Sequence, residues 1–255
     1  MIIQKKKLIA KINLSYYQST KGEDLIVLLH GWGASKEKLL PLGKALEKQN
    51  WQILIPDLPG FGKTKPPSKP WGVNEYAQFV LEIIAALDGK QNIYLFGHSF
   101  GGRLAIKIAS LYPQKIKGII LCGSAGLSRA NFFKRTFFLV IAKIGKVILP
   151  KSHSYRRLVY KLAREHDYEK TKGVMKQTFR LVIAEDLKPL LSKIKLPTLI
   201  CWGLKDKETK FADAQLINSR IKNSQLISFP GLGHKLPYEE PRLLAKKITK
   251  WKEGQ

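Results

Sequence analysis

The chain has 255 residues, of which 44% are hydrophobic, so it can bury a sizeable core and disorder is not expected. Its 45 Lys and Arg residues outnumber its 19 Asp and Glu residues, for a formal net charge of +26. Because most of the excess is lysine, we interpret it as a general surface bias and expect no specific nucleic-acid site, which would need arginine. Weak electrostatic association with a membrane stays open as an alternative.

The cysteine content and the length of the apolar stretches bear on the cellular compartment of the protein. The two cysteines, Cys122 and Cys201, lie in apolar strand-like runs and are expected to be reduced core thiols. No secretory signal is visible, and the longest apolar stretch, residues 137–149, is interrupted and too short to cross a bilayer. We therefore expect a soluble, cytoplasmic protein.

Apolar runs of strand length alternate with helical patterns through the first half of the chain. We expect strands over residues 8–17, 25–29, 51–55, 94–97 and 116–122, and helices over 36–48, 74–87 (with Asn74 as N-cap) and 103–111. Continuous apolar strands separated by helices are typical of a mostly parallel sheet covered on both faces. The fold class is therefore predicted to be α/β.

The alternation breaks in the middle of the chain. Residues 126–185 contain helical patterns and no clear strand. The alternation then resumes with a strand over 197–203, a helix over 211–220, a strand over 224–229 and a helix over 241–251. We predict one α/β core, residues 1–125 and 186–255, with a helical insertion over 126–185.

A Gly-x-Ser-x-Gly sequence, Gly97-His98-Ser99-Phe100-Gly101, joins a predicted buried strand to a predicted helix. The pentapeptide alone is a weak signal, but this context is that of a nucleophile elbow, whose central residue is held in a strained backbone conformation. Side chains at Gly97 and Gly101 would clash across such a turn. Ser99 is therefore the candidate nucleophile.

A serine hydroxyl needs a base, and the base needs an orienting group. His234 lies in a glycine-rich loop directly after the last predicted strand, and in a parallel sheet that loop emerges at the same edge as the elbow. Asp206 follows the preceding strand and is the candidate acid. Glu208 is its nearest competitor, while Asp186 and Asp213 would be displaced from the edge.

A tetrahedral intermediate also needs amide donors for its oxyanion. We expect one from Phe100, the residue after the nucleophile, and the second from Trp32, in the loop His30-Gly31-Trp32-Gly33. The Trp32 side chain is then expected to line the acyl pocket.

The remaining histidines and Cys122 have plainer interpretations. His30 is expected to brace the loop that carries Trp32, and His98 to pack within the elbow. His153 and His166 lie in the polar insertion and are expected at the surface. Cys122 ends its strand and could approach the site, although a core thiol is favoured.

Several ordered motifs resemble those of the α/β-hydrolase superfamily, in its small serine-hydrolase branch. They span the chain from about residue 25 to 251 and comprise His30-Gly31-Trp32-Gly33, Pro56-Asp57-Leu58-Pro59-Gly60-Phe61-Gly62, Gly97-His98-Ser99-Phe100-Gly101-Gly102, Trp202-Gly203-Leu204-Lys205-Asp206 and Gly233-His234. The order Ser99, Asp206, His234 is that of the superfamily. One departure is Lys210, where relatives often have proline four residues after the acid.

The resemblance implies a mostly parallel eight-stranded sheet with a helical cap, or lid, formed by the insertion. A serine nucleophile makes dehalogenase and epoxide hydrolase chemistry unexpected, because those relatives use a carboxylate. We expect a serine carboxylesterase for short- to medium-chain esters that needs no metal or organic cofactor. Lactone, amide or β-lactam, and carbon–carbon bond hydrolysis stay open, as does a ligand-binding member without turnover.

The substrate partner is expected to be a small-molecule ester, bound by a monomer or a homodimer. Aromatic and aliphatic side chains of the insertion indicate an apolar pocket, and the residues chosen for it are Phe137, Phe138 and Leu127. Packing of the lid onto the core would account for the same pattern.

Overall fold

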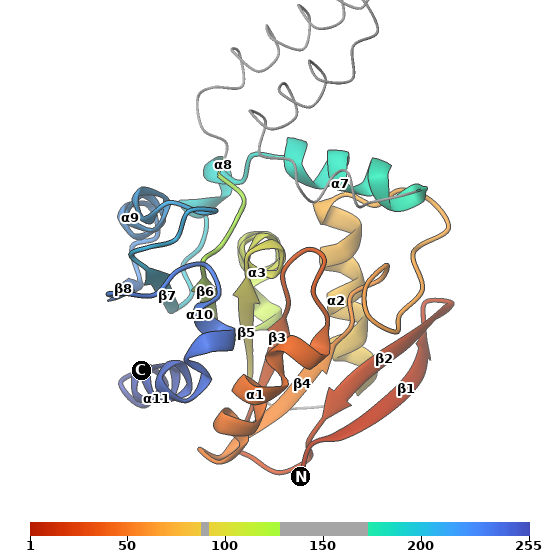
Figure 1. The fold of residues 1–255 in the computed structure, drawn as a ribbon, viewed down its shortest axis with the longest axis horizontal. Coiled ribbons are helices and arrows are strands. Elements are labelled where there is room, and N and C mark those ends of the chain that lie inside the picture. The colour runs from red at the N-terminus through yellow and green to blue at the C-terminus, as the bar shows by residue number, and fades with distance from the viewer. Residues whose placement is uncertain (88–91, 128–172) are drawn as a thin grey trace, which may run out of the picture.

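A computed structural model describes residues 1–87, 92–127 and 173–255 of the chain. Its eight strands form one sheet in the order β1-β2-β4-β3-β5-β6-β7-β8. β1 and β2 run antiparallel to each other, β2 is antiparallel to β4, and the remaining neighbours are parallel. The predicted α/β class, with its mostly parallel eight-stranded sheet, is confirmed (Figure 1).

The parallel strands are buried along their whole length, apart from the first residue of β5 and most of β8 at the edge. This burial explains why they are continuous apolar runs in the sequence. The strand bounds are β1 Ile3–Ile9, β2 Ile12–Gln18, β3 Asp24–Leu29, β4 Trp51–Pro56, β5 Ile93–His98, β6 Gly118–Cys122, β7 Thr198–Gly203 and β8 Ser224–Phe229.

The first predicted strand, residues 8–17, was wrong in its bounds, because this region forms a hairpin of two strands. Its two turn residues, Ala10 and Lys11, both have positive φ angles, 46° and 67°. Asn-Gly or Asp-Gly normally marks such a turn, so the sequence carries no local signal for it. The outer strand β1 exposes lysines, which disfavour pairing with another sheet edge.

Helices cover both faces of the sheet. Apolar side chains of α2, α3 and α9 pack on one face, and those of α1, α10 and α11 pack on the other. The bounds of the helices are α1 Lys36–Glu47, α2 Val73–Leu87, α3 Phe100–Leu111, α7 Val174–Ala184, α8 Lys188–Leu191, α9 Phe211–Arg220, α10 Leu236–Glu239 and α11 Pro241–Glu253, with a 3-10 turn at Pro113–Lys115.

The start of α2 differs from the prediction. Asn74 is not the N-cap, since the helix already begins at Val73. Instead, the Glu75 carboxylate accepts a 2.8 Å hydrogen bond from the Gly72 amide, which is the return half of a capping box. A side chain in the first turn of the helix thus satisfies the amide of Gly72, the residue just before the helix.

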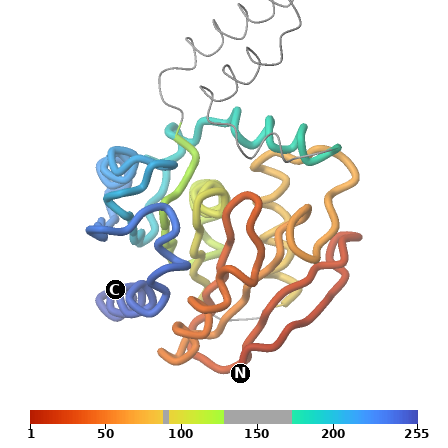
Figure 2. The backbone as a smooth tube through the Cα atoms, in the orientation of Figure 1, coloured from red at the N-terminus to blue at the C-terminus, as the bar shows by residue number. Residues whose placement is uncertain are grey.

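The carboxyl ends of the parallel strands meet at one edge of the sheet, and α7 lies across this end of the molecule (Figure 1). Both chain termini lie at the end away from α7 (Figure 2). Most of the predicted insertion, residues 128–172, lies outside the described residues, so its role as a lid stays a prediction. Among the described helices, none is both long and apolar enough to cross a membrane.

Candidate active site

Ser99 lies at the turn between β5 and α3, with φ 51° and ψ −109°. A positive φ is costly for a residue with a side chain, so the surrounding turn must hold it in place. Added Cβ atoms explain the flanking glycines: on Gly97 one would lie 2.4 Å from the Gly101 carbonyl oxygen, and on Gly101 one would lie 2.2 Å from the Leu29 carbonyl oxygen. The Ser99 amide also donates to the Cys122 carbonyl at 3.2 Å, which ties the elbow to β6.

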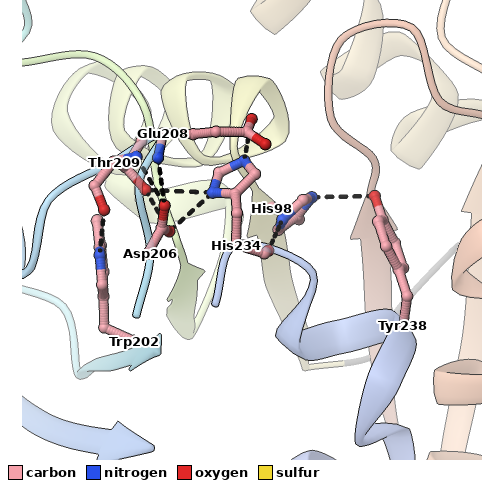
Figure 3. A network of polar contacts seen from close by, with 7 residues as sticks. All are labelled: His98, Trp202, Asp206, Glu208, Thr209, His234 and Tyr238. Carbon is pink, nitrogen blue, oxygen red and sulfur yellow. Dashed lines mark hydrogen bonds and ion pairs between the residues drawn. The ribbon is translucent and has the colours of Figure 1, made fainter. Parts of the chain in front are cut away.

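His234 and Asp206 contact each other at the same edge of the sheet (Figure 3). His234 Nδ1 lies 2.8 Å from Asp206 Oδ2, while the amides of Glu208 and Thr209 each donate to Asp206 Oδ1 at 2.8 Å. The Thr209 hydroxyl donates to Asp206 Oδ2 at 2.7 Å. Burial alone would raise the pKa of Asp206, but the hydrogen bonds from His234 and Thr209 outweigh it and hold that pKa below its usual value.

The loops after β7 and β8 bring this pair together. The amides of Leu204 and Lys205 donate to the carbonyls of Phe229 and Leu232, at 3.1 and 2.8 Å. The Trp202 indole donates to the Thr209 carbonyl at 2.9 Å, which fixes the turn around the carboxylate. The orienting role of Thr209 was missed in the sequence, where a single threonine between charged residues carries no signal.

Gly123, directly after β6, lies against the His234–Asp206 pair. Its φ is +51°, and an added Cβ would lie 3.2 Å from both Asp206 Oδ2 and His234 Nδ1. A glycine therefore supplies both the backbone conformation and the space that the pair occupies. No motif marked Gly123 in the sequence, because only the strand register places it there.

The loop that carries Trp32 touches the elbow, since an added Cβ on Gly31 would lie 3.3 Å from Ser99 Cβ. His30 Nδ1 donates to the Gly31 carbonyl at 2.8 Å, and its Nε2 accepts from the Leu58 amide at 3.1 Å. Burial lowers the pKa of His30, which is consistent with this neutral ring. His30 thus braces the loop that carries Trp32, as the sequence predicted.

Trp32 and Phe100, the predicted oxyanion donors, lie side by side, with ring centroids 5.3 Å apart. Phe100 is the first residue of α3, so its amide has no acceptor within the helix. The Trp32 ring also packs against Phe61 at 4.9 Å and Phe179 of α7 at 5.0 Å. Aromatic side chains therefore surround the loop, and Phe61 and Phe179 were not predicted as part of the site.

α7 is attached to the core beside this cluster. Arg103 of α3 donates to the carbonyls of Val182 and Glu185, at 2.9 and 3.0 Å, and the Trp71 amide donates to the Thr178 hydroxyl at 3.1 Å. Arg103 lies four residues after Ser99, so α3, which begins directly after Ser99, also holds the end of the predicted insertion.

His98 does more than pack within the elbow. Its Nε2 donates to the His234 carbonyl at 2.8 Å, and its Nδ1 accepts from the Tyr238 hydroxyl at 3.0 Å (Figure 3). Burial, with a contribution from His234, lowers the pKa of His98 to about 3, so the ring is neutral at working pH. His98 therefore connects the elbow to the backbone of the His234 loop.

A buried ion pair supports the other side of the site. The Lys36 ammonium lies 2.7 Å from Asp57 Oδ2, and both side chains are fully buried. Asp57 Oδ1 also accepts from the Lys36 amide at 2.8 Å. The pair joins the start of α1 to the loop after β4, the two segments that flank Trp32.

The remaining residues that the sequence suggested for the site lie in several parts of the chain. Among the candidate acids, it is Asp206 and not Asp186 or Asp213 that is bonded to His234 Nδ1, and Leu127 packs half-buried against the core. Phe137, Phe138, His153 and His166 lie outside the described residues. In the described part of the chain, no group of three or more His, Cys, Asp or Glu side chains could hold a metal ion.

A serine at a strained strand-to-helix turn and a His–Asp pair at the carboxyl edge of this sheet define an α/β hydrolase. The chain belongs to this family: the family model described as alpha/beta hydrolase fold matches residues 24–241.

Curated relatives and solved structures agree with this assignment. Lipase 1 of Psychrobacter immobilis is 28% identical over 84% of this chain and 71% of its own. Lipase 3 of Moraxella sp. (strain TA144) is 26% identical over 91% and 78%. The structure is similar to an esterase from Exiguobacterium antarcticum, with a TM-score of 0.74, 20% identity and coverage of 98% of this chain and 100% of that one. The chain is a hydrolase, and its similarity to lipases and esterases is distant.

Proposed function

We propose that this hydrolase is a serine carboxylesterase acting on short- to medium-chain esters. The observation that carries the proposal is Ser99, held at φ 51° beside the loop of Trp32 and at the same sheet edge as the His234–Asp206 pair. The similarity to two lipases and to the fold of an esterase supports ester chemistry.

In the proposed reaction, Ser99 Oγ attacks the ester carbonyl carbon while His234 Nε2 takes its proton. Asp206 holds the Nδ1 proton and stabilises the imidazolium that forms. The amides of Trp32 and Phe100 donate to the oxyanion, and each such donor contributes roughly 10²–10³-fold in rate. His234 then protonates the leaving alcohol, and a water molecule, activated by the same ring, releases the acid.

The apolar surroundings of the site favour an apolar acyl group. Trp32 lies among Phe61, Phe100 and Phe179, and Met175 of α7 lies against Gly60 nearby. Such a wall binds hydrocarbon through burial of apolar area, at about 25 cal/mol per Å². We expect the preference to reach a maximum at an intermediate chain length.

The test is a series of p-nitrophenyl esters of increasing acyl length, measured with the wild type and Ser99→Ala together. Ser99→Ala is expected to lose ester turnover and to keep its circular dichroism spectrum and melting temperature. Panels of lactones, β-lactams and diketones measured in parallel would show whether another bond is preferred. Turnover by Ser99→Ala, or a preference for one of these other substrates over every ester, would refute the proposal.

A further inference from the structure

The His98 side chain holds both ends of the segment from His234 to Tyr238. His98 Nε2 donates to the His234 carbonyl at 2.8 Å, and the Tyr238 hydroxyl lies 3.0 Å from His98 Nδ1 (Figure 3). The rings of His98 and Tyr238 meet edge to face, with their centroids 5.0 Å apart. The segment that begins at the proposed base therefore returns, four residues later, to the side chain next to Ser99.

The start of α10 produces this return of the chain. The Leu236 amide donates to the Gly233 carbonyl at 3.3 Å, and the Tyr238 amide donates to the Lys235 carbonyl at 2.8 Å. Pro237 suits the first turn of a helix, because its φ is fixed and the amide that it lacks would have no partner there. Backbone bonds thus close the segment whose two ends His98 holds.

The two contacts of His98 require one particular form of its ring. A carbonyl oxygen only accepts, so Nε2 carries a proton, and because burial lowers the pKa of His98 to about 3, Nδ1 carries none. Nδ1 is therefore an acceptor, and the Tyr238 hydroxyl is its donor. In the opposite tautomer, the lone pair of Nε2 would face the His234 carbonyl oxygen and be repelled by it.

The loop of the proposed oxyanion donor lies against the same two side chains. An added Cβ on Gly31 would lie 3.2 Å from His98 Nδ1 and 3.6 Å from its Cε1. Burial raises the pKa of Tyr238, and a hydrogen bond from the Gly31 backbone acts in the opposite direction. Because Gly31 directly precedes Trp32, the contacts of His98 and Tyr238 reach all three segments that the proposed reaction uses.

We propose that Tyr238 is a positioning residue, whose hydroxyl holds His98 in the Nε2–H tautomer so that His98 fixes the backbone of His234. One peptide bond joins His98 to Ser99, so a displacement of the His234 backbone changes the distance between nucleophile and base. A displacement of 1 Å at a reacting group costs about 10²-fold in rate, so a small movement reduces turnover. This inference rests on the proposed function for its effect on turnover, but not for its effect on the tautomer of His98.

The test compares Tyr238→Phe with a matched control, Tyr76→Phe. The Tyr76 hydroxyl donates to the Pro59 carbonyl at 2.8 Å, so its loss removes a buried hydrogen bond but not the donor to His98. Each change is also made together with His98→Gln, whose amide can still donate to the His234 carbonyl but offers no acceptor in place of Nδ1. His98→Met has a similar length without any donor, and it is the control for this rescue.

The first readout is the pair of ¹⁵N NMR signals from the His98 ring, assigned by their correlation with the His98 backbone. We expect the wild type to show a neutral ring that is protonated on Nε2. In Tyr238→Phe the Nδ1 signal should move, because that nitrogen loses its hydrogen-bond donor. Tyr76→Phe should leave both signals in place.

The second readout is ester turnover. Tyr238→Phe should lower kcat by about three- to tenfold, the net effect of one hydrogen bond, with little change in KM. In the His98→Gln background it should have no further effect, because the acceptor is already gone, whereas Tyr76→Phe should have the same effect in both backgrounds. His98→Gln should retain more of kcat than His98→Met.

A wild-type His98 ring protonated on Nδ1 would overturn the inference, as would an unchanged Nδ1 signal or an unchanged kcat in Tyr238→Phe. Equal effects of Tyr238→Phe with and without His98→Gln would overturn the link through His98. If the wild type hydrolyses no ester but the Nδ1 signal moves in Tyr238→Phe, the proposed function fails and the hold of Tyr238 on His98 stands.

Discussion

Gly123→Ala tests how closely the backbone after β6 is fitted to the His234–Asp206 pair. The alanine Cβ would lie 3.2 Å from Asp206 Oδ2 and from His234 Nδ1. Ordinary contacts of a carbon atom lie at ~3.5–4.0 Å, so the pair must yield by roughly 0.3 Å. Gly123 also has φ +51°, so alanine there adds backbone strain.

Two separate effects follow from these numbers. A left-handed conformation costs a residue with a side chain roughly 1–2 kcal/mol, which lowers the melting temperature of a chain of this size by about 2–8 °C. Displacement of a catalytic group by 1 Å costs about 10²-fold in rate, so 0.3 Å corresponds to about fourfold in kcat/KM.

Gly173→Ala separates the two effects. Gly173 has a similar φ of +57°, but an added Cβ there meets nothing within 4 Å in the described structure. We expect both variants to lose a similar amount of thermal stability, measured by calorimetry, and only Gly123→Ala to show the decrease of about fourfold in kcat/KM for an ester. Equal kcat/KM for the two variants would refute the contact argument, and a stable, fully active Gly123→Ala would refute both parts.

Three further predictions concern the supports of the site. Thr209→Val removes the hydroxyl bonded to Asp206 Oδ2 at 2.7 Å, so kcat should fall several-fold with little change in KM. Thr209→Ser keeps the hydroxyl and should retain kcat. Equal kcat in the two variants would contradict this prediction. Lys36→Met leaves the buried Asp57 carboxylate without its cation, so the free energy of unfolding, measured in urea, should fall by about 3 kcal/mol. A decrease of less than about 1 kcal/mol would contradict the expected role of the pair. Burial alone would raise the pKa of Glu37, but the hydrogen bonds from Lys36 and Ser35 lower it to about 2, so Glu37 stabilises the fold above pH ~4.5 and loses that effect as pH falls toward 2. Glu37→Gln should therefore make stability less dependent on pH in this window, and an unchanged dependence would count against it.

Much of the fold follows from the sequence because its signals are local. The strands β7 and β8 and the helices α9 and α11 occupy nearly the residues that periodicity predicted. The N-terminal hairpin was missed because Ala10 and Lys11 adopt left-handed φ angles without glycine or asparagine. That conformation is imposed by strand pairing over Ile3–Gln18, which no local pattern reports.

The candidate site, like the fold, could be predicted only where its signals are local in the sequence. Motif order placed Ser99, Asp206 and His234 at one sheet edge, and the structure brings the last two into contact; their catalytic roles stay predictions. Gly123 reaches the pair only through the register of β6 against β7, strands that are distant in the sequence. Such juxtapositions are tertiary, so single-sequence reasoning has no pattern from which to derive them.

The most direct test of the central claim is labelling with a fluorophosphonate, followed by mass spectrometry of the digested protein. We expect one adduct per chain, on the peptide that contains Ser99, with loss of ester hydrolysis in proportion to labelling. Ser99→Ala should take up no label and hydrolyse no ester. An adduct on another residue, or ester hydrolysis that persists in the fully labelled protein, would contradict the assignment of Ser99 as the nucleophile.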